Sequence, residues 1–270
     1  MKQLPVYLTM ILLLISLLGT ACAVPPTVPT VTTTSPATTA TSTKATPVKI
    51  KVATDATWPP FESVNVKTMA VEGFDIDLLN AVAAKEGLAV EFSNVNFNTL
   101  LADMAQCKYD AAISSITITA ERKRNMFFSD PYFAAGQMVT VRQDNTDINS
   151  KNNLYLKRVG VQTGSTGATE LEKIAGVIVK PYDDIDQAFQ DLISNKLDAV
   201  VADNPLATVY VGKNPDKLKT VGIVFTEEYY GIAVCNKNKS LLDKINNGLK
   251  LVKNDGTVDN LIKKWFYSQQ

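Results

Sequence analysis

The sequence predicts an α/β fold with two lobes of similar design. Short apolar segments typical of strands alternate with amphipathic segments typical of helices, and this alternation occurs twice along the chain. Strands separated by helices of about ten residues favour parallel sheets with crossover connections. An internal repeat supports two equivalent halves, because residues 97–115 and 189–203 both contain an aspartate followed by a buried strand. We therefore predict two Rossmann-like lobes, with Ser115 and Asp203 at equivalent strand ends.

The first half of the pattern begins with an apolar strand at residues 48–53. A helix is expected at residues 74–85, because Ile76, Leu79 and Val82 recur on one face. The other elements expected in this half are a strand at 88–92, a helix at 98–106 and a strand at 111–114.

The second half repeats this order of strands and helices. Its expected elements are strands at 158–161, 177–181 and 199–202 and helices at 166–174 and 184–195. A further strand at 230–235 and two helices at 240–253 and 257–266 complete the prediction. The apolar spacing in these last helices indicates core positions without a functional role.

The N-terminal segment has the features of an export signal. Lys2 precedes an apolar segment at residues 6–18, which is too short to cross a membrane as a helix. Residues 19–22 then resemble a bacterial lipoprotein site, and residues 21–23 alternatively fit ordinary cleavage after an A-x-A motif. We predict that Cys22 is lipidated.

The segment after Cys22 has the composition of a disordered tether. Residues 24–47 consist almost entirely of Thr, Pro, Ala, Ser and Val, which cannot bury enough surface to fold. A tether is useful when its far end is anchored, and a generic disordered leader is the alternative. We therefore predict a signal peptide at 1–21 and a lipid-anchored linker at 22–47.

Composition argues against several classes of function. The chain has 27 basic and 27 acidic residues, so no basic field favours a nucleic-acid partner. It contains no histidine, which removes imidazole metal sites and nucleophiles that histidine activates. We expect neither a metal nor a cofactor. Cys107 and Cys235 have core-like neighbours and are expected to be two buried thiols, with a disulfide as the alternative in an exported protein.

Polar groups follow the strand expected at residues 111–114. Ser114, Ser115 and Thr117 lie at the end of this strand, and Arg122 follows them. Ligands of α/β folds bind at such strand ends. An arginine guanidinium matches a carboxylate through two parallel hydrogen bonds. This pattern favours a small anionic or zwitterionic ligand.

A second group of candidate donors precedes the helix expected at residues 166–174. Gly164-Ser165-Thr166-Gly167 places amide groups at a helix start, where the helix dipole favours an anion. The segment lacks the lysine of a nucleotide-binding P-loop. Ser165 and Thr166 are the expected donors, and a plain glycine turn with a helix cap is the alternative.

Five motifs occur in an order that points to one family. They are residues 53–62, 73–78, 110–133, 158–167 and 198–203. With them the chain resembles, over residues 48–270, the extracellular solute-binding proteins that supply polar amino acids to bacterial ABC importers. The resemblance implies a periplasmic binding protein-like fold of type II, with two lobes joined by a two-strand hinge. It places lobe 1 at 48–135 and 229–270, and lobe 2 at 136–228.

The resemblance also implies how a bound amino acid is held by its backbone groups. The residues expected at the α-carboxylate are Arg122, Thr117, Ser114, Ser115, Ser165 and Thr166. Asp203 matches the acid that pairs with the α-ammonium group, and a cap of the following helix is its alternative role. Thr119 is expected to cap a turn instead.

The side chain of the ligand is expected to meet aromatic and polar groups. Trp58, Phe61 and Phe97 match the aromatic positions that enclose it, with a core role as the alternative for Trp58. Asp55 matches an acid that contacts side-chain nitrogens, and Gln162 lies at another position facing the side chain. Aromatic faces and an acid suit a guanidinium or ammonium group.

These features predict a receptor that closes over a basic amino acid of the arginine and lysine class, with glutamine as the alternative. We expect a monomer that is tethered to the outer face of the membrane, delivers its ligand to a separate permease and is not an enzyme. Two other classes of function are alternatives. One is a sensory module, and the other is a dehydratase-like lyase whose general acid would be Asp55, Asp203, Glu227 or Glu228.

Overall fold

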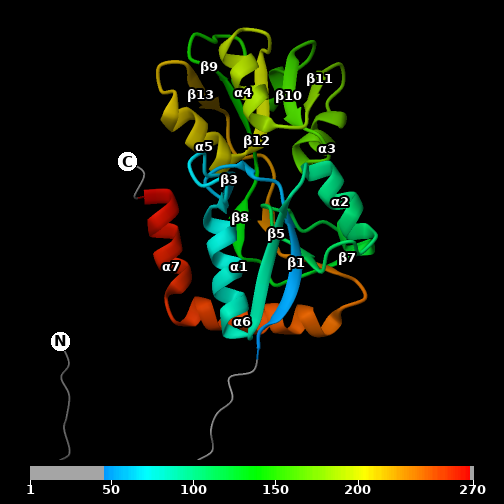
Figure 1. The fold of residues 1–270 in the computed structure, drawn as a ribbon. Helices are drawn as coiled ribbons and strands as arrows, with labels where there is room; N and C mark the ends of the chain where they lie inside the picture. Colours follow the sequence, from blue (N-terminus) through cyan, green and yellow to red (C-terminus); the bar gives the residue numbers. More distant parts are fainter. Residues whose placement is uncertain (1–45, 268–270) are drawn as a thin grey trace, which may run out of the picture. The chain divides into compact units, whose positions relative to one another are not determined.

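Figure 1 shows the computed structural model, in which residues 46–267 are described. The expected signal peptide, the lipidation site Cys22 and the expected linker up to residue 45 lie outside the described residues. From residue 46 to residue 267, no helix has the length and apolar character needed to cross a bilayer. Over the same range, no cluster of cysteine, aspartate and glutamate side chains is placed to hold a metal ion.

The first of two five-stranded sheets combines segments from both ends of the described chain. In sheet order its strands are β5 (Leu88–Asn94), β1 (Val48–Thr54), β6 (Ala111–Ala112), β15 (Ala233–Cys235) and β7 (Met126–Phe128). β1 pairs in parallel with β5 and β6, whereas β15 runs antiparallel to β6 and β7. The helices that pack on this sheet are α1 (Phe74–Lys85), α2 (Phe97–Ala105) and α6 (Lys239–Asn254).

The second sheet is built from one continuous stretch of the chain. In sheet order its strands are β11 (Ile178–Tyr182), β10 (Arg158–Gln162), β12 (Ala199–Asp203), β9 (Gln137–Arg142) and β13 (Leu218–Val221). β10 is parallel to β11 and β12, and β9 is antiparallel to β12 and β13. Its helices are α3 (Thr166–Glu172), α4 (Ile185–Ile193) and α5 (Asn204–Lys213).

Two short strands connect the sheets. β8 (Phe133–Ala135) leads directly into β9 of the second sheet, and β14 (Glu228–Tyr230) leads back to β15 of the first. β8 and β14 pair with each other in an antiparallel ribbon. The expected α/β class, with two sheets joined by two strands, is therefore confirmed. The sheets are mixed, whereas parallel sheets were expected, because each has two parallel and two antiparallel strand pairs. A small sheet of β2 (Thr57–Trp58), β3 (Glu62–Val64) and β4 (Val71–Glu72) lies between β1 and α1 in the chain.

The start of α1 is fixed by a close backbone contact. Gly73 has φ 144°, and a Cβ atom there would lie 2.0 Å from the carbonyl oxygen of Phe61, so only glycine fits. The same carbonyl accepts a hydrogen bond from the amide of Asp75 at 2.9 Å. The predicted apolar face of the helix is buried, including Ile76 and Leu79. This packing anchors the β2–β3 loop and brings Asp75 beneath it.

Several elements differ from the sequence prediction. α5 was not among the expected elements, although a helix after Asp203 was considered as the alternative role of that residue. Its buried residues Leu206, Ala207 and Tyr210 do have helical spacing, but further apolar residues on its other faces obscure this pattern in the sequence. The strand expected at 230–235 is two strands, since the chain leaves the ribbon at Gly231, whose amide bonds to the carbonyl of Ile116. The helix expected at 257–266 consists of α7 (Thr257–Ile262) followed by a π-helical segment, η3 (Lys263–Tyr267).

The two described cysteines form a disulfide. Cys107 and Cys235 are bonded, with their Cα atoms 5.0 Å apart and a sequence separation of 128. The expectation of two buried thiols is therefore wrong, because α2 ends next to the end of β15 only in the folded chain. The bond joins the N-terminal and C-terminal contributions to the first sheet.

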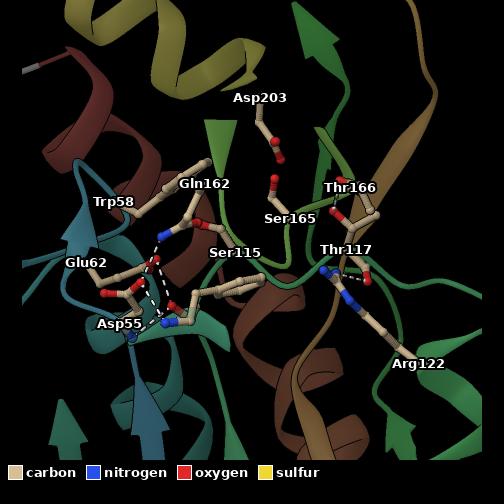
Figure 2. Close-up of a pocket in the computed structure, with 12 residues that line it drawn as sticks. Asp55, Trp58, Glu62, Ser115, Thr117, Arg122, Gln162, Ser165, Thr166 and Asp203 are labelled. Atoms are coloured by element: carbon tan, nitrogen blue, oxygen red, sulfur yellow. Dashed lines mark hydrogen bonds between the residues drawn. The ribbon is translucent and has the colours of Figure 1, made fainter. Parts of the chain in front are cut away.

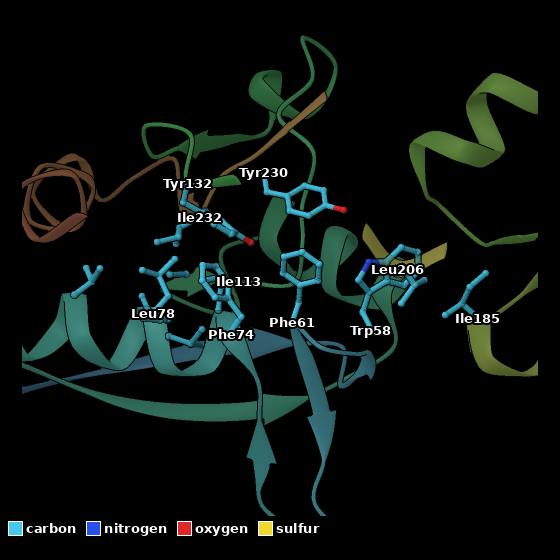
Figure 3. Close-up of a cluster of buried hydrophobic side chains, with 14 of the residues drawn as sticks. Trp58, Phe61, Phe74, Leu78, Ile113, Tyr132, Ile185, Leu206, Tyr230 and Ile232 are labelled. Carbon is cyan, nitrogen blue, oxygen red and sulfur yellow. The ribbon is translucent and has the colours of Figure 1, made fainter. Parts of the chain in front are cut away.

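An aromatic cluster packs beneath the connecting ribbon (Figure 3). The ring of Phe61 lies 4.9 Å from that of Phe133 in β8, 5.4 Å from that of Tyr230 in β14 and 5.2 Å from that of Phe266 near the C-terminus. The same apolar core extends past Trp58 to Ile185 and Leu206 of the second sheet's helices. The two halves are therefore in apolar contact beside the site described next.

Candidate functional site

A polar cavity lies at the carboxyl ends of four parallel strands, two from each sheet. Asp55 follows β1 and Ser114 follows β6, whereas Gln162 ends β10 and Asp203 ends β12. Strand ends of this kind are the usual ligand sites of α/β folds. The cavity is small, because the side chains that line it leave about 20 Å³ of free space.

Eleven of the twelve residues expected to contact a ligand line this cavity (Figure 2). They are Asp55, Trp58, Phe97, Ser114, Ser115, Thr117, Arg122, Gln162, Ser165, Thr166 and Asp203. Glu62 completes the lining and was not expected. Phe61 was expected, but its side chain is fully buried in the aromatic cluster under the ribbon.

The exchange of Phe61 for Glu62 has a simple geometric reason. Successive side chains point to opposite sides of an extended backbone, and β3 begins at Glu62. With Phe61 directed into the core, the next side chain faces the cavity. A carboxylate beside an aromatic residue in the motif at 53–62 is the signal that could have found it.

Acidic groups gather at one side of the cavity. Asp55 Oδ2 accepts hydrogen bonds from Gln162 Nε2 at 2.9 Å and from the amide of Phe97 at 3.1 Å. The bond from Gln162 crosses from the second sheet to the first. Burial raises the pKa of Asp55 to about 6, against the hydrogen bonds that stabilise its ionised form.

Glu62 lies beside Asp55 and shares its burial. Glu62 Oε1 accepts a hydrogen bond from the Ser114 hydroxyl at 3.2 Å, and Ser114 Oγ accepts one from the amide of Asp55 at 2.9 Å. Burial, followed by the charge of Asp75, raises the pKa of Glu62 well above its ordinary value. Asp75 is itself bound by the Tyr132 hydroxyl at 2.6 Å and the Ser115 amide at 2.8 Å. The two buried carboxyl groups therefore disfavour each other's ionised form.

Arg122 supplies the positive charge of the site. Its guanidinium donates to the carbonyl oxygens of Thr117 at 2.8 Å and of Gly164 at 3.0 Å, so it contacts both halves. Its Cζ atom lies 5.4 Å from the centre of the Phe97 ring. Burial lowers the pKa of Arg122, and the charges of Asp203 and Glu228 act against this shift. Arginine has five N–H donors, so further donors remain for a ligand.

Asp203 is held by two groups near the connecting ribbon. Its Oδ1 accepts from Gln137 Nε2 at 2.5 Å, and its Oδ2 accepts from the Tyr230 hydroxyl at 2.5 Å. It forms no side-chain capping bond with α5, although it precedes that helix directly. Burial and then the charge of Glu228 raise the pKa of Asp203 to about 7.

The two candidate donors of the second half have different surroundings. The Ser165 hydroxyl accepts from the amide of Ala168 at 3.1 Å and so caps α3. The Thr166 hydroxyl donates to Glu228 Oε2 at 2.7 Å and accepts from Gln137 Nε2 at 3.2 Å. Thr119 accepts from the amide of Arg122 at 3.1 Å, which is the turn cap expected for it.

This arrangement defines a class of protein: a two-lobed α/β binding protein with one charged cavity between its sheets. Residues 50–268 match the family described as bacterial extracellular solute-binding proteins, family 3, and the chain belongs to that family. Its fold is the type II fold of periplasmic amino-acid-binding proteins.

Known relatives cover most of the chain. It is 34% identical to a "Probable histidine-binding protein" of Neisseria gonorrhoeae, over 82% of this chain and 85% of the relative. It is 34% identical to a "Putative ABC transporter arginine-binding protein 2" of Escherichia coli, over 80% and 90%. A solved structure, "An ancestral arginine-binding protein bound to glutamine", is 45% identical with a TM-score of 0.77, and the alignment covers 81% of this chain and 97% of that one.

Proposed function

We propose that this protein is the substrate-binding component of an amino-acid ABC importer and that it prefers basic amino acids of the arginine and lysine class. The observation that carries the preference is the buried pair of acidic side chains, Asp55 and Glu62, at one side of the cavity. Buried acids without a cationic partner are costly, and a guanidinium or ammonium group would supply that partner. The relatives described as arginine-binding support the same preference.

The remaining charges suit the backbone groups of an amino acid. Figure 2 shows Arg122 on the side of the cavity opposite Asp55 and Glu62. We assign Arg122 to the α-carboxylate, because a guanidinium fork matches a carboxylate. Asp203 is assigned to the α-ammonium group, which would stabilise its ionised form against burial. Trp58 and Phe97 then flank the aliphatic part of the side chain.

We infer that two lobes open and close about the ribbon of β8 and β14, and that a ligand bound between them favours the closed arrangement. Lobe 1 would comprise residues 48–135 and 229–270, and lobe 2 residues 136–228. Closure is favoured when a ligand contacts both lobes. The hydrogen bond between Gln162 and Asp55 and the one from Arg122 to the second lobe already join the two lobes. The closed protein would act as a monomer and deliver its ligand to the membrane permease.

Members of this family act outside the cytoplasm, and we propose that this one is held at the membrane through lipidation of Cys22. Expression in a bacterial host followed by mass spectrometry of the N-terminal peptide tests this. A diacylglycerol mass on Cys22 supports the tether, whereas a free N-terminus after residue 23 contradicts it.

A calorimetric ligand panel tests the proposed function. Arginine, lysine, ornithine, histidine, glutamine and cystine are titrated into the protein, and thermal unfolding is followed in parallel. A ligand at a hundred times its Kd stabilises the native state by about 2.7 kcal/mol. We expect arginine or lysine to bind most tightly. A protein that binds glutamine tightly and arginine weakly would contradict the basic preference and leave amino-acid binding intact.

Paired variants assign the preference to its residues. Asp55→Asn removes one acidic group without changing the size of the side chain, and we expect it to weaken arginine more than glutamine. Asp216→Asn is the matched control, because Asp216 is exposed and does not line the cavity. If Asp55→Asn weakens the binding of arginine and of glutamine equally, Asp55 does not contact the side chain of the ligand.

One observation favours a second candidate function. A pKa of about 7 at Asp203 suits a general acid, which a dehydratase-like lyase on this scaffold requires. The same protein sample is therefore incubated with a prephenate-like substrate, and product is measured by absorbance. Product formation abolished by Asp203→Asn would replace the receptor assignment with a catalytic one.

A further inference from the structure

Glu228 is a buried carboxylate in β14, the returning strand of the ribbon between the lobes. Its Oε2 accepts one hydrogen bond from the Thr117 hydroxyl at 2.8 Å and another from the Thr166 hydroxyl at 2.7 Å. Thr117 belongs to the first lobe and Thr166 begins α3 in the second. A single oxygen atom therefore joins hydroxyl groups from both lobes. Its Oε1 is fixed by the Thr226 hydroxyl at 2.8 Å.

The bridge lies at the boundary between the cavity and a larger groove. Thr117, Arg122 and Thr166 line both the cavity and the groove, whereas Glu228 lines the groove alone. Arg122 is near enough to Glu228 for the two charges to interact. A ligand carboxylate that binds Arg122 would therefore approach the carboxylate of Glu228.

The hydroxyl protons can serve only one acceptor at a time. A threonine hydroxyl has one proton to donate. While the protons of Thr117 and Thr166 are directed to Glu228, neither is available to a ligand carboxylate. Two carboxylates at one site also repel each other. The donors assigned to an α-carboxylate are thus already used by a carboxylate of the protein itself.

We propose that Glu228 is a positioning residue that holds the lobes together in the empty protein, and that the α-carboxylate of the ligand displaces it from Thr117 and Thr166. The displacement rests on the proposed amino-acid-binding function, whereas the bridge in the empty state does not.

The direction in which a substitution at Glu228 changes the ligand affinity distinguishes this role from a structural one. A contact that stabilises the empty closed state and is lost on binding lowers the affinity for the ligand. Its removal therefore tightens binding of a ligand that has an α-carboxylate. A contact that persists in the bound state would weaken binding when removed.

Calorimetry with two ligands tests the displacement. Arginine and agmatine, which is arginine without its α-carboxylate, are titrated into wild-type protein, Glu228→Ala and Glu228→Gln. Glu227→Gln is the matched control, since it removes the same charge from the neighbouring exposed residue. We expect the Glu228 variants to bind arginine roughly tenfold more tightly, the contribution of one charge-assisted hydrogen bond, and agmatine no more tightly. Unchanged or weaker arginine binding, or an equal gain for agmatine, would overturn the displacement.

Small-angle X-ray scattering of the ligand-free proteins tests the bridge independently. We expect wild type and Glu227→Gln to share one radius of gyration and Glu228→Ala to have a larger one. Glu228→Gln retains the shape of the side chain, so it provides the test if the alanine variant does not fold. Equal radii for all four proteins would overturn the bridge. If wild type binds no amino acid, the proposed function fails, and the scattering result still decides whether Glu228 holds the lobes together.

Discussion

Lowering the pH is expected to weaken arginine binding steeply between pH 8 and pH 5. In the empty protein, burial raises the pKa of Asp203 to about 7 and that of Asp55 to about 6. A ligand cation beside each carboxyl favours the ionised form and lowers its pKa. Binding at low pH must therefore expel protons. Full affinity is present above pH 7 and is lost as the pH falls through these two values.

The size of the effect follows from the distance between each pKa and the pH. At pH 5, Asp203 must be ionised about two pH units below its pKa and Asp55 about one unit below. Each unit costs about 1.4 kcal/mol, so the two groups together cost about 4 kcal/mol. The affinity for arginine should therefore fall by up to about a thousandfold from pH 8 to pH 5.

Calorimetry at half-unit pH intervals measures this dependence. Below pH 6 the logarithm of the affinity should approach a slope of two per pH unit for wild type. Asp55→Asn removes one titrating group, so its slope should approach one over the same interval. Affinity that stays constant from pH 5 to pH 8, or an unchanged slope in Asp55→Asn, would refute the assignment of these carboxyl groups to ligand cations.

Three further predictions concern stability and packing. The empty protein should lose stability towards urea as the pH rises from 5 to 8. The pKa values of Asp55, Asp75 and Asp203 are raised in the folded state, so the folded protein binds more protons than the unfolded chain. The stability that these protons contribute is lost as the pH rises through 6–7. Reduction of the disulfide at Cys235 should lower the free energy of unfolding by about 2–4 kcal/mol, measured by urea titration with and without reductant; equal midpoints would contradict this. Phe61→Ala should cost about 3–5 kcal/mol of stability in the same assay, since it opens a hole in the aromatic cluster; a cost below 1 kcal/mol would show that the cluster rearranges.

The residues that line the cavity could be found from sequence because most of them follow parallel strands. Asp55, Gln162 and Asp203 stand at or next to the ends of β1, β10 and β12, and the apolar runs that mark those strands are visible in the chain. The same regularity placed α1, whose buried residues recur at helical spacing. Local periodicity therefore carried the fold and the strand ends, whereas the roles of Asp55, Gln162 and Asp203 at those ends came from the resemblance to extracellular solute-binding proteins.

The features that escaped prediction depend on how distant segments meet. The bond between Cys107 and Cys235 needs the C-terminal strand β15 to be inserted beside β6, which no local pattern shows. The orientation of Phe61 depends on its contact with Phe266 from the end of the chain. Glu228 was considered as a general acid in a lyase, whereas its bonds to Thr117 and Thr166 became visible only in the folded arrangement.

The charges of the cavity explain why ligand and closure should be coupled. Asp55 and Glu62 are buried on one side, and Asp203 is buried near Glu228, so acidic groups outnumber the one arginine of the lining. In the empty protein this imbalance is reduced by protons, as the raised pKa values of the carboxyl groups indicate. A basic amino acid brings two positive charges and one negative charge, and so replaces protons with ionic contacts from both lobes. A neutral amino acid brings no net charge and leaves at least one buried acid protonated, which is why affinity for a basic ligand should rise more steeply with pH than affinity for glutamine.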